Sequence, residues 1–322
     1  MENAITDVPG ILVGHAQDME ALTGCTVVVC KKGAIAGVDC RGGGPGTREL
    51  AALNPENTVA RAHAVYMGGG SAFGLAGADG VMRYLEENQV GFDTRIAYVP
   101  IVPGAILYDL LIGDPSRRPD SEMGYAACCN LKSAGIEQGC VGAGTGATVG
   151  IAGGQSAVMK GGIGTASVKK GDLIVGAIVA VNSVGDVVDP DTGRILAGAI
   201  SKDGKTFLEA KKLMSEHPPK SLDFIKNTTI GVIATNAKMT SAQAKRIAIM
   251  THDGFARSII PVHSHTDGDT IFCLSTGDVE TSMDTVGIMA TDAVMESILN
   301  AIKFAKSCGG VPAYSDLPWN KN

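Results

Sequence analysis

The sequence predicts a layered α/β protein, because short apolar runs and helical patterns alternate along the chain with no fixed repeat. Runs rich in Val, Ile and Thr predict strands, and apolar residues at three- and four-residue spacing predict helices. The expected strands are 26–29, 95–99, 173–181, 229–234 and 270–274. The expected helices are 71–87, 121–133, 206–216, 241–255 and 285–306.

Local signals support individual elements. Ser71 follows MGGG, and Thr240-Ser241 precedes AQAKRIA, so both places carry residue types that favour a helix N-cap. The run 173–181, LIVGAIVAV, is too short to cross a bilayer and suits a buried strand. The segment 216–221, EHPPKS, is polar and interrupted by prolines, which predicts an exposed connector that extends to Asn227.

Composition narrows the classes of function. The 322 residues are enough for one large domain or two smaller ones, with 45% hydrophobic and 19% charged residues. The formal net charge is −6 and no long Lys/Arg block occurs, so neither nucleic acid nor a membrane is expected as a partner. The first residues, MENAITDVPG, lack the pattern of a signal peptide, and a cytoplasmic location is expected.

The cysteines and the glycine-rich stretches are expected to have structural roles. No CxxC pair occurs, so a structural zinc site lacks support, and the cysteines are expected to be reduced core residues, with a Cys nucleophile as the alternative. They are Cys25, Cys30, Cys40, Cys128, Cys129, Cys140, Cys273 and Cys308. The stretch 142–147, GAGTGA, fits a loose dinucleotide fingerprint, but the following TVGIAGG is too rich in glycine for a phosphate-binding helix. No nucleotide or other cofactor is expected.

Four segments occur in an order that indicates a family: MKGGIGTAS, VAVNSVGDVVDPDTG, NTTIGVIAT and HSHTDGDT. With GVDCRGGGPGTREL and GGGSAFGLAGADGV nearer the start, the chain resembles the DmpA-type L-aminopeptidase/D-esterase family, which includes β-peptidyl aminopeptidases and nylon-oligomer hydrolases. The resemblance implies an αββα sandwich of the type shared with ornithine acetyltransferases. It also implies an N-terminal-nucleophile-like hydrolase and a homotetramer of processed αβ units.

The step from Asn227 to Thr228 is the expected site of self-cleavage, as in the nylon-oligomer hydrolases. A threonine hydroxyl is a weak nucleophile that needs a base nearby. Cleavage before Thr228 would create such a base, because a free α-amino group has a reference pKa of about 7.7 to 8.0. Thr229 is the competing nucleophile by residue type, whereas position in the motif favours Thr228. The structural alternative for Thr228 is a β-branched residue that begins a strand.

Three further residues match the site positions of the family. Asn182 ends an apolar run, where its amide could donate to an oxyanion, although a turn asparagine before Gly185 is the alternative. Lys160 lies between apolar and glycine residues and could polarise the scissile carbonyl or tune the amine of Thr228; most lysines are instead solvated. Tyr108 resembles the tyrosine of the substrate pocket, with a half-buried aromatic as the alternative.

Asp267 and Asp269 flank a glycine, so both side chains could point the same way and orient an ammonium group. The alternative is a solvated Asp-Gly-Asp turn. Some relatives carry Ser and Glu here, so the Asp pair favours the nylon-hydrolase-like variant over a simple α-aminopeptidase. His263 and His265 alternate beside the pair, but four metal ligands cannot be assembled, and no metal is expected. No Gly-x-Ser-x-Gly elbow indicates a Ser-His-Asp triad.

These observations predict one hydrolase domain over 1–322, cleaved into an α chain, 1–227, and a β chain, 228–322. The expected substrates are short peptides, amino-acid amides or esters, or ω-amino-acid oligomers. Two alternatives stay open: an acyltransferase like ornithine acetyltransferase, and a non-catalytic glycine-rich protein that binds a small molecule.

Overall fold

The computed structural model describes residues 1–216 and 227–320. Most of the predicted connector, from 217 onward, lies outside the described residues. The main sheet has the strand order β10-β11-β14-β16-β2-β4-β7-β3, and β1 pairs with β2 beside this path. In chain order its strands are β1 (Leu12–Asp18), β2 (Thr23–Cys40), β3 (Gly46–Arg48), β4 (Arg61–Gly68), β7 (Gly104–Ile106), β10 (Gly162–Lys170), β11 (Leu173–Asn182), β14 (Thr228–Ala237) and β16 (Thr270–Val279).

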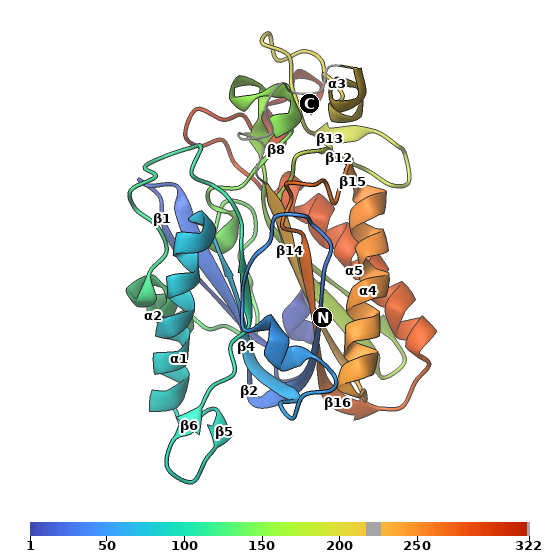
Figure 1. Cartoon of the computed structure of the whole chain (residues 1–322). Coiled ribbons are helices and arrows are strands. Elements are labelled where there is room, and N and C mark those ends of the chain that lie inside the picture. Colours follow the sequence, from blue (N-terminus) through green and yellow to red (C-terminus); the bar gives the residue numbers. More distant parts are fainter. Residues whose placement is uncertain (217–226, 321–322) are drawn as a thin grey trace.

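The helices and smaller strands surround this sheet. The helices are α1 (Gly77–Glu87), α2 (Ser121–Cys129), α3 (Ala210–Glu216), α4 (Ser241–Ser258) and α5 (Met283–Lys303). Three small sheets are formed by β5 (Phe92–Asp93) with β6 (Tyr98–Val99), by β8 (Thr148–Val149) with β9 (Met159–Lys160), and by β12 (Asp186–Val188) between β13 (Ile195–Ala197) and β15 (Ile259–Ile260). In Figure 1, α1 and α2 lie on one side of the strands and α4 and α5 on the other.

Alternating side chains divide the interior into three apolar layers. In β2, Val27 packs in the core shared with α1 and α2, whereas Val28 faces an inner core between the two halves of the sheet. In β11, Ile178 faces the same inner core, and Val179 packs in the core shared with α4 and α5. This two-residue period produces the expected αββα order of layers.

The predicted strands 26–29, 173–181, 229–234 and 270–274 lie within β2, β11, β14 and β16. The prediction for 95–99 is wrong over most of its length. Arg95 has a φ of 66°, and its N–H donates to Asp93 Oδ1 at 2.7 Å, so it lies in the turn between β5 and β6. Only Tyr98–Val99 forms a strand there.

The predicted helix starts at 121 and 241 match those of α2 and α4, whereas the other starts differ from the prediction. Thr240 is the N-cap of α4, and its side chain and that of Gln243 form the reciprocal capping box. Ser71 is not a side-chain cap: Gly70 precedes the first turn, Ser71 itself has a φ of 56°, and Ser71–Ala76 is a 3₁₀ helix before α1. α2 ends at Cys129 rather than at 133, and α3 begins at Ala210 rather than at 206.

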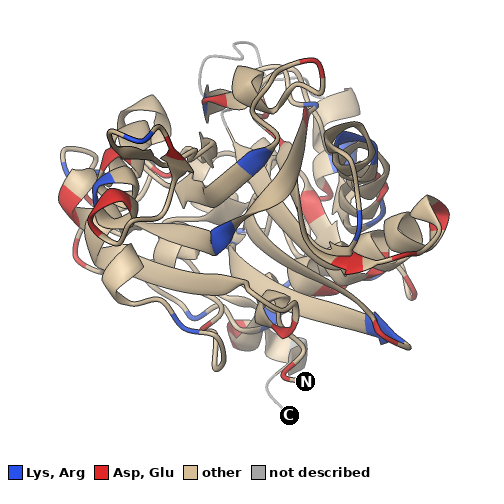
Figure 2. Ribbon diagram, turned by 90° about the horizontal axis from the view of Figure 1, so that it is seen from below, with Lys and Arg blue, Asp and Glu red and all other residues tan. Residues whose placement is uncertain are grey.

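Helix α5 is long and apolar enough to cross a membrane by length and composition, yet 56% of that stretch is buried inside the protein. It packs on β10 and β11, as a core helix does. Figure 2 shows the charged residues concentrated on the peripheral helices and loops, with few on the strands of the sheet. The sheet therefore provides an apolar frame, and polar residues inside it stand out.

Candidate active site

Asn182 and Thr228 are paired in register at the ends of the antiparallel strands β11 and β14. Both side chains are buried, with 0% and 4% exposure. Because the side-chain period of a strand is two, Thr228 shares the face of Ile230, and Asn182 shares the face of Ile178; both of these isoleucines belong to the inner core. The candidate nucleophile and the candidate oxyanion donor therefore lie at one end of the space between the sheet halves.

A cavity of about 390 Å³ opens at this end of the sheet. Its lining comes from distant segments and includes Pro45, Ser71, Ile106, Tyr108, Thr228 and His265. The structure thus brings Tyr108 and Thr228 to one cavity, as the sequence predicts for a substrate pocket. This cavity has the size of ordinary small-molecule sites.

Asn182 is fixed by two hydrogen bonds. Its Oδ1 accepts from the backbone N–H of Thr148 at 2.9 Å, and its Nδ2 donates to the carbonyl of Tyr108 at 3.1 Å. A side-chain amide carries two N–H donors, so one remains for a further acceptor. The alternative of a turn asparagine is not what the structure shows, because Asn182 is the last residue of β11.

The carbonyl of Asn227 is contacted from two sides. The Thr228 hydroxyl donates to it with an Oγ1 to O distance of 2.6 Å, and the N–H of Gly268 donates to it at 3.1 Å. Gly268 has no room for a side chain, because a Cβ atom there would lie 2.7 Å from Thr228 Oγ1. Glycine between the two aspartates therefore allows the loop to contact both the Thr228 hydroxyl and the Asn227 carbonyl.

Asp267 and Asp269 are both buried, with 2% exposure each, so they do not form a solvated turn. Asp269 Oδ1 accepts from the N–H of Thr229 at 2.7 Å, and its Oδ2 accepts from the backbone and ring nitrogens of His263 at 3.0 and 2.8 Å. Asp267 Oδ2 accepts from the N–H of Ser264 at 2.8 Å, while its Oδ1 is buried without a hydrogen-bond partner. The two aspartates thus hold different partners.

Burial raises the pKa of Asp267 to about 7, and the negative charge of Asp269 adds to this effect. A carboxyl group in this state can hold or release a proton near neutral pH. His263 contacts Asp269 and His265 lines the cavity. Across residues 1–216 and 227–320, no three His, Cys, Asp or Glu side chains converge as a metal site would need.

Thr229, the competing nucleophile by residue type, points away from Thr228 because neighbouring residues of a strand alternate. It is fully buried, and its hydroxyl has no hydrogen-bond partner. It is absent from the lining of the cavity that contains Thr228. A bound substrate in that cavity would therefore meet the hydroxyl of Thr228.

Lys160 is fully buried, as the apolar and glycine neighbours suggest, but its amine is not hydrogen bonded to Thr228 in the described structure. Its Nζ donates to the carbonyls of Thr145 and Ala147 at 2.9 and 2.7 Å. Burial lowers the pKa of Lys160, while Cys140, Cys308 and Asp109 act in the opposite direction. The glycine-rich stretch 142–147 thus binds an ammonium through its carbonyls.

Asp109 is a buried residue of this region that the sequence analysis missed. Its Oδ2 accepts from the Thr23 hydroxyl at 2.7 Å, and its Oδ1 accepts from the N–H of Gly70 at 2.6 Å, next to Ser71 of the cavity wall. Burial raises its pKa. The available signal was an acid within the apolar run GAILYDLLIG, directly after Tyr108.

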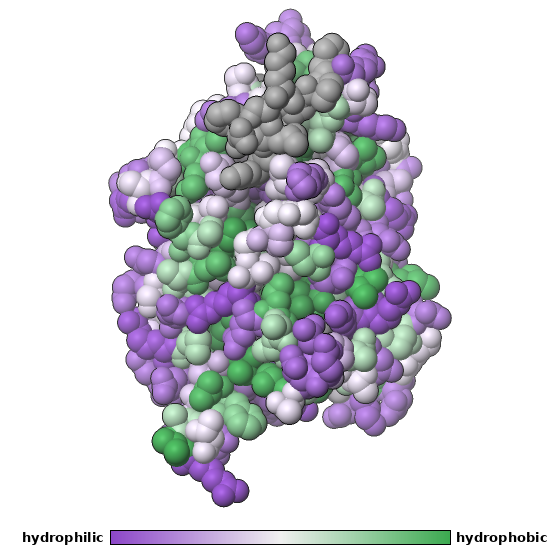
Figure 3. All heavy atoms as spheres, viewed as in Figure 1, coloured by the Kyte–Doolittle hydropathy of each residue, from purple (hydrophilic) through white to green (hydrophobic). Residues whose placement is uncertain are grey.

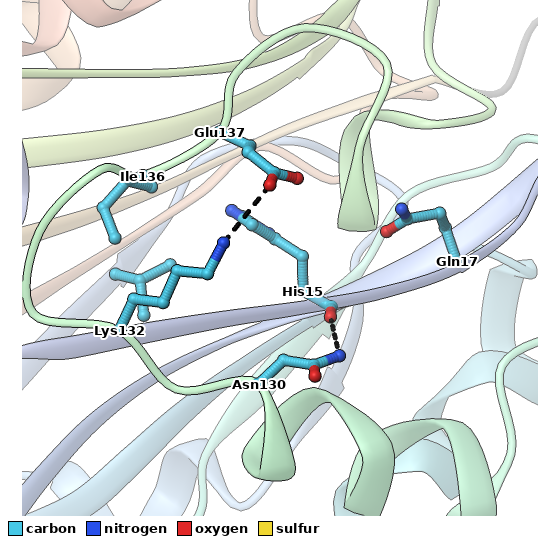
Figure 4. Close-up of a pocket in the computed structure, with 7 residues that line it drawn as sticks. His15, Gln17, Asn130, Lys132, Ile136 and Glu137 are labelled. Carbon is cyan, nitrogen blue, oxygen red and sulfur yellow. Dashed lines mark hydrogen bonds and ion pairs between the residues drawn. The ribbon is translucent and has the colours of Figure 1, made fainter.

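A second cavity, of about 240 Å³, lies apart from these residues beside β1 and α2 (Figure 4). Lys132 and Glu137 pair across it at 3.2 Å, and Asn130 donates to the carbonyl of His15. Burial lowers the pKa of His15 to about 4, so its ring is neutral near pH 7. No Ser, Thr or Cys side chain lines this cavity, which favours the Thr228 cavity as the active site.

The cysteines are all unpaired, but they are not all core residues. Cys25, Cys30, Cys128 and Cys273 are buried, whereas Cys129 is exposed, and Cys40, Cys140 and Cys308 are partly exposed. The sequence-based prediction is therefore wrong for Cys129 and incomplete for the other three. None of the eight lines the Thr228 cavity.

The order of layers matches the N-terminal-nucleophile hydrolase type of fold. The L-aminopeptidase/D-Ala-esterase/amidase of Ochrobactrum anthropi, described as a variant of that fold, superposes with a TM-score of 0.72 at 22% identity over 97% of this chain and 88% of its own. A β-aminopeptidase of Burkholderia sp. gives a TM-score of 0.69 at 22% identity, over 97% and 91% of the two chains. The αββα prediction is confirmed.

Residues 3–314 match the model of peptidase family S58, and the chain belongs to this family. An uncharacterised aminopeptidase of Mycobacterium leprae is 41% identical over 98% of this chain and 94% of its own. A 6-aminohexanoate-oligomer endohydrolase of Kocuria sp. is 28% identical over 92% and 85%. The protein is therefore a hydrolase of amide bonds, and neither the acyltransferase nor the non-catalytic alternative is favoured.

Proposed function

We propose that the chain cleaves itself between Asn227 and Thr228 and then hydrolyses amides with the N-terminal threonine. The observation that carries this proposal is the convergence of the Thr228 hydroxyl and the Gly268 N–H on the Asn227 carbonyl, at 2.6 and 3.1 Å. The hydroxyl oxygen would add to the carbonyl carbon, and the Gly268 N–H would stabilise the negative oxygen. The bond from the Asn227 carbonyl carbon to the Thr228 nitrogen then breaks, and this nitrogen takes up the hydroxyl proton. The amide has become an ester, which water hydrolyses to free the carboxylate of Asn227 and the hydroxyl of Thr228.

Cleavage would supply the base for the second reaction. The freed amine of Thr228 has an ordinary pKa of about 7.7 to 8.0, so it can accept the hydroxyl proton near neutral pH. The hydroxyl attacks the substrate carbonyl, and the second N–H of Asn182 donates to the developing oxyanion. The amine product leaves, and water releases the acyl group from Thr228.

The two aspartates would have separate roles. Asp269 holds the backbone of Thr229 and thereby fixes the start of β14, on which Thr228 stands. Asp267 has a free, buried oxygen next to Gly268, so we assign it to the new ammonium of Thr228 or to the amine of a substrate. Lys160 would act indirectly. Its amine anchors the carbonyls of Thr145 and Ala147, and the N–H of the next residue, Thr148, donates to the side chain of Asn182.

The cavity and the relatives support a proposed class of substrate. A space of about 390 Å³ with Tyr108 and Ile106 in its wall suits a short chain with an apolar body. We propose short peptides, amino-acid amides or esters, and ω-amino-acid oligomers, in keeping with relatives named as aminopeptidases and as a 6-aminohexanoate-oligomer endohydrolase.

The processed enzyme would also self-associate, and a homotetramer is the expected form. The hairpin of β5 and β6 projects from the fold and carries exposed apolar side chains: Ile96 is 96% exposed and Phe92 is 64% exposed. Figure 3 shows apolar residues at the end of the molecule where Figure 1 places this hairpin. Such a projection is typical of a contact between subunits.

Intact mass under denaturing conditions tests the proposed cleavage. The wild-type protein should give two masses that meet between Asn227 and Thr228, and Thr228→Ala should give one. Thr228→Ser should still cleave because it keeps a hydroxyl, and Thr229→Ala serves as the matched control that should also cleave. Cleavage of Thr228→Ala, or an uncleaved wild type after long incubation, would rule the mechanism out.

Processed protein should then release amine from 6-aminohexanoate oligomers or amino-acid amides.

A further inference from the structure

Cys140 and Cys308 lie beside each other although they are far apart in the sequence. The thiol of Cys140 donates to the carbonyl of Lys306 at 3.1 Å, and the N–H of Lys306 approaches the same sulfur at 3.4 Å. The backbone before Cys140 is equally close, since a Cβ atom on Gly139 would lie 2.2 Å from the carbonyl of Phe304. Cys308 follows two residues after Lys306, so its thiol lies close enough to that of Cys140 to interact with it.

The two thiols differ in acidity in the way that an attacking and a resolving cysteine differ. The hydrogen bond from Cys308 lowers the pKa of Cys140 to about 6, and the ammonium of Lys160 acts in the same direction against the effect of burial. The same hydrogen bond raises the pKa of Cys308. Both side chains are partly exposed, so a small oxidant has access to them.

We propose that Cys140 and Cys308 form a site of oxidative modification, in which a hydroperoxide converts the two thiols into a disulfide. The Cys140 thiolate attacks one peroxide oxygen, and a sulfenic acid and water are formed when hydrogen peroxide is the oxidant. The Cys308 sulfur then attacks the Cys140 sulfur, and the sulfenic oxygen leaves as a second water. The two thiols lose two electrons and two protons in total, and the peroxide is reduced to two waters.

This disulfide would join the two chains of the processed enzyme, because Cys140 lies before the proposed cleavage site and Cys308 lies after it. That consequence rests on the proposed function, whereas the disulfide itself does not. Oxidation would also remove a negative sulfur that raises the pKa of the buried amine of Lys160. Oxidation of the two cysteines would therefore change the charge around Lys160, which supports the proposed active site.

Peptide mapping tests the disulfide whether or not the chain is cleaved. The full-length protein is treated with hydrogen peroxide, its remaining thiols are alkylated, and it is digested without reductant. The expected product is a linked peptide pair that contains Cys140 and Cys308, has lost two hydrogens, and separates with dithiothreitol. Cys140→Ser and Cys308→Ser should each abolish the pair, whereas Cys129→Ser, at an exposed position of α2, should keep it.

Denaturing gels without reductant give the second readout. Oxidised wild type should run as one covalent αβ species that dithiothreitol separates into two chains. If Cys140 gains one or two oxygen atoms while Cys308 remains a free thiol, the proposed disulfide is wrong. A single full-length band that persists with dithiothreitol, and also in Cys308→Ser, would count against self-cleavage. The peptide map would still show whether the disulfide forms.

Discussion

Asn182 and Thr228 lie opposite each other as register partners on β11 and β14, with Asn182 Nδ2 bonded to the carbonyl of Tyr108. The backbone pairing of two central strands fixes this relationship, so neither residue depends on a flexible loop for its position. If Thr228 is the nucleophile and Asn182 the oxyanion donor, as proposed, this register preorganises both groups for acyl transfer.

The first prediction concerns Asn182. In the processed enzyme, Asn182→Ala should lower kcat for amide hydrolysis by about 100- to 1,000-fold, because a lost oxyanion donor typically costs that much. KM should change far less, since the donor acts mainly in the transition state. Steady-state kinetics on an amino-acid amide checks this. A change confined to KM would assign Asn182 to substrate binding instead.

The second prediction separates steric pressure on the nucleophile from general loss of packing. Gly268→Ala should slow self-cleavage strongly, because the new Cβ would lie 2.7 Å from Thr228 Oγ1. Gly231→Ala, on the same strand as Thr228, is the matched control: its nearest contacts would be 3.4 Å away, an ordinary separation. The rate of appearance of the two chains by mass spectrometry measures the effect. Equal rates in both variants would contradict the arrangement.

The third prediction concerns pH and Asp267, whose pKa in the folded protein is raised from 3.8 to about 7. Between these values the folded state retains a proton that the unfolded state has released, so this group makes the free energy of unfolding fall as pH rises from about 4 to about 7. Asp267→Asn cannot ionise and should flatten that decline.

Urea unfolding at several pH values checks this, in a Thr228→Ala background that keeps one uncleaved chain. The exposed Asp292→Asn on α5 is the control and should leave the pH dependence as it is. A steeper decline in Asp267→Asn would show that the carboxyl of Asp267 is ionised and stabilised in the fold.

The fourth prediction concerns the projecting hairpin. Ile96 is 96% exposed in the isolated chain, and the proposed assembly would bury it between subunits. Ile96→Asp would place a charge in that interface and should reduce the assembly to smaller species. Light scattering after gel filtration gives the mass. Ile288→Asp, on α5 and 62% exposed, is the control and should leave the mass unchanged. An unaltered oligomer in Ile96→Asp would place the interface elsewhere.

The sequence predicted the central strands and α4 well, because alternation of apolar residues and the Thr240 cap are local signals. It could not predict the positive φ of Ser71, because a distant segment holds that residue. Ser71 is held by the carbonyl of Leu107, which lies far along the chain. The apolar pattern of 95–99 also overlooked the local bond from Arg95 to Asp93 that forms the turn.

The candidate site was also predicted only in part from the sequence. The motif singled out Thr228, Asn182 and Tyr108; in the structure Thr228 and Tyr108 line one cavity, and Asn182 donates to the carbonyl of Tyr108. It could not show that Lys160 reaches backbone carbonyls and two cysteines, or that Asp109 is buried beside Thr23, because these contacts join segments with no common local pattern. Long-range packing decides which polar groups inside an apolar sheet become neighbours.

The position of β14 has a consequence for how the enzyme can be made. β14 and β16, both from 228–322, are flanked in the sheet by β11 and β2 from 1–227. The uncleaved chain folds in a unimolecular process. The two chains that the proposed cleavage would produce would have to find each other again after unfolding, so their renaturation would depend on concentration. Native protein lost to heat would then be replaced by new synthesis, and its lifetime would be set by the rate of unfolding.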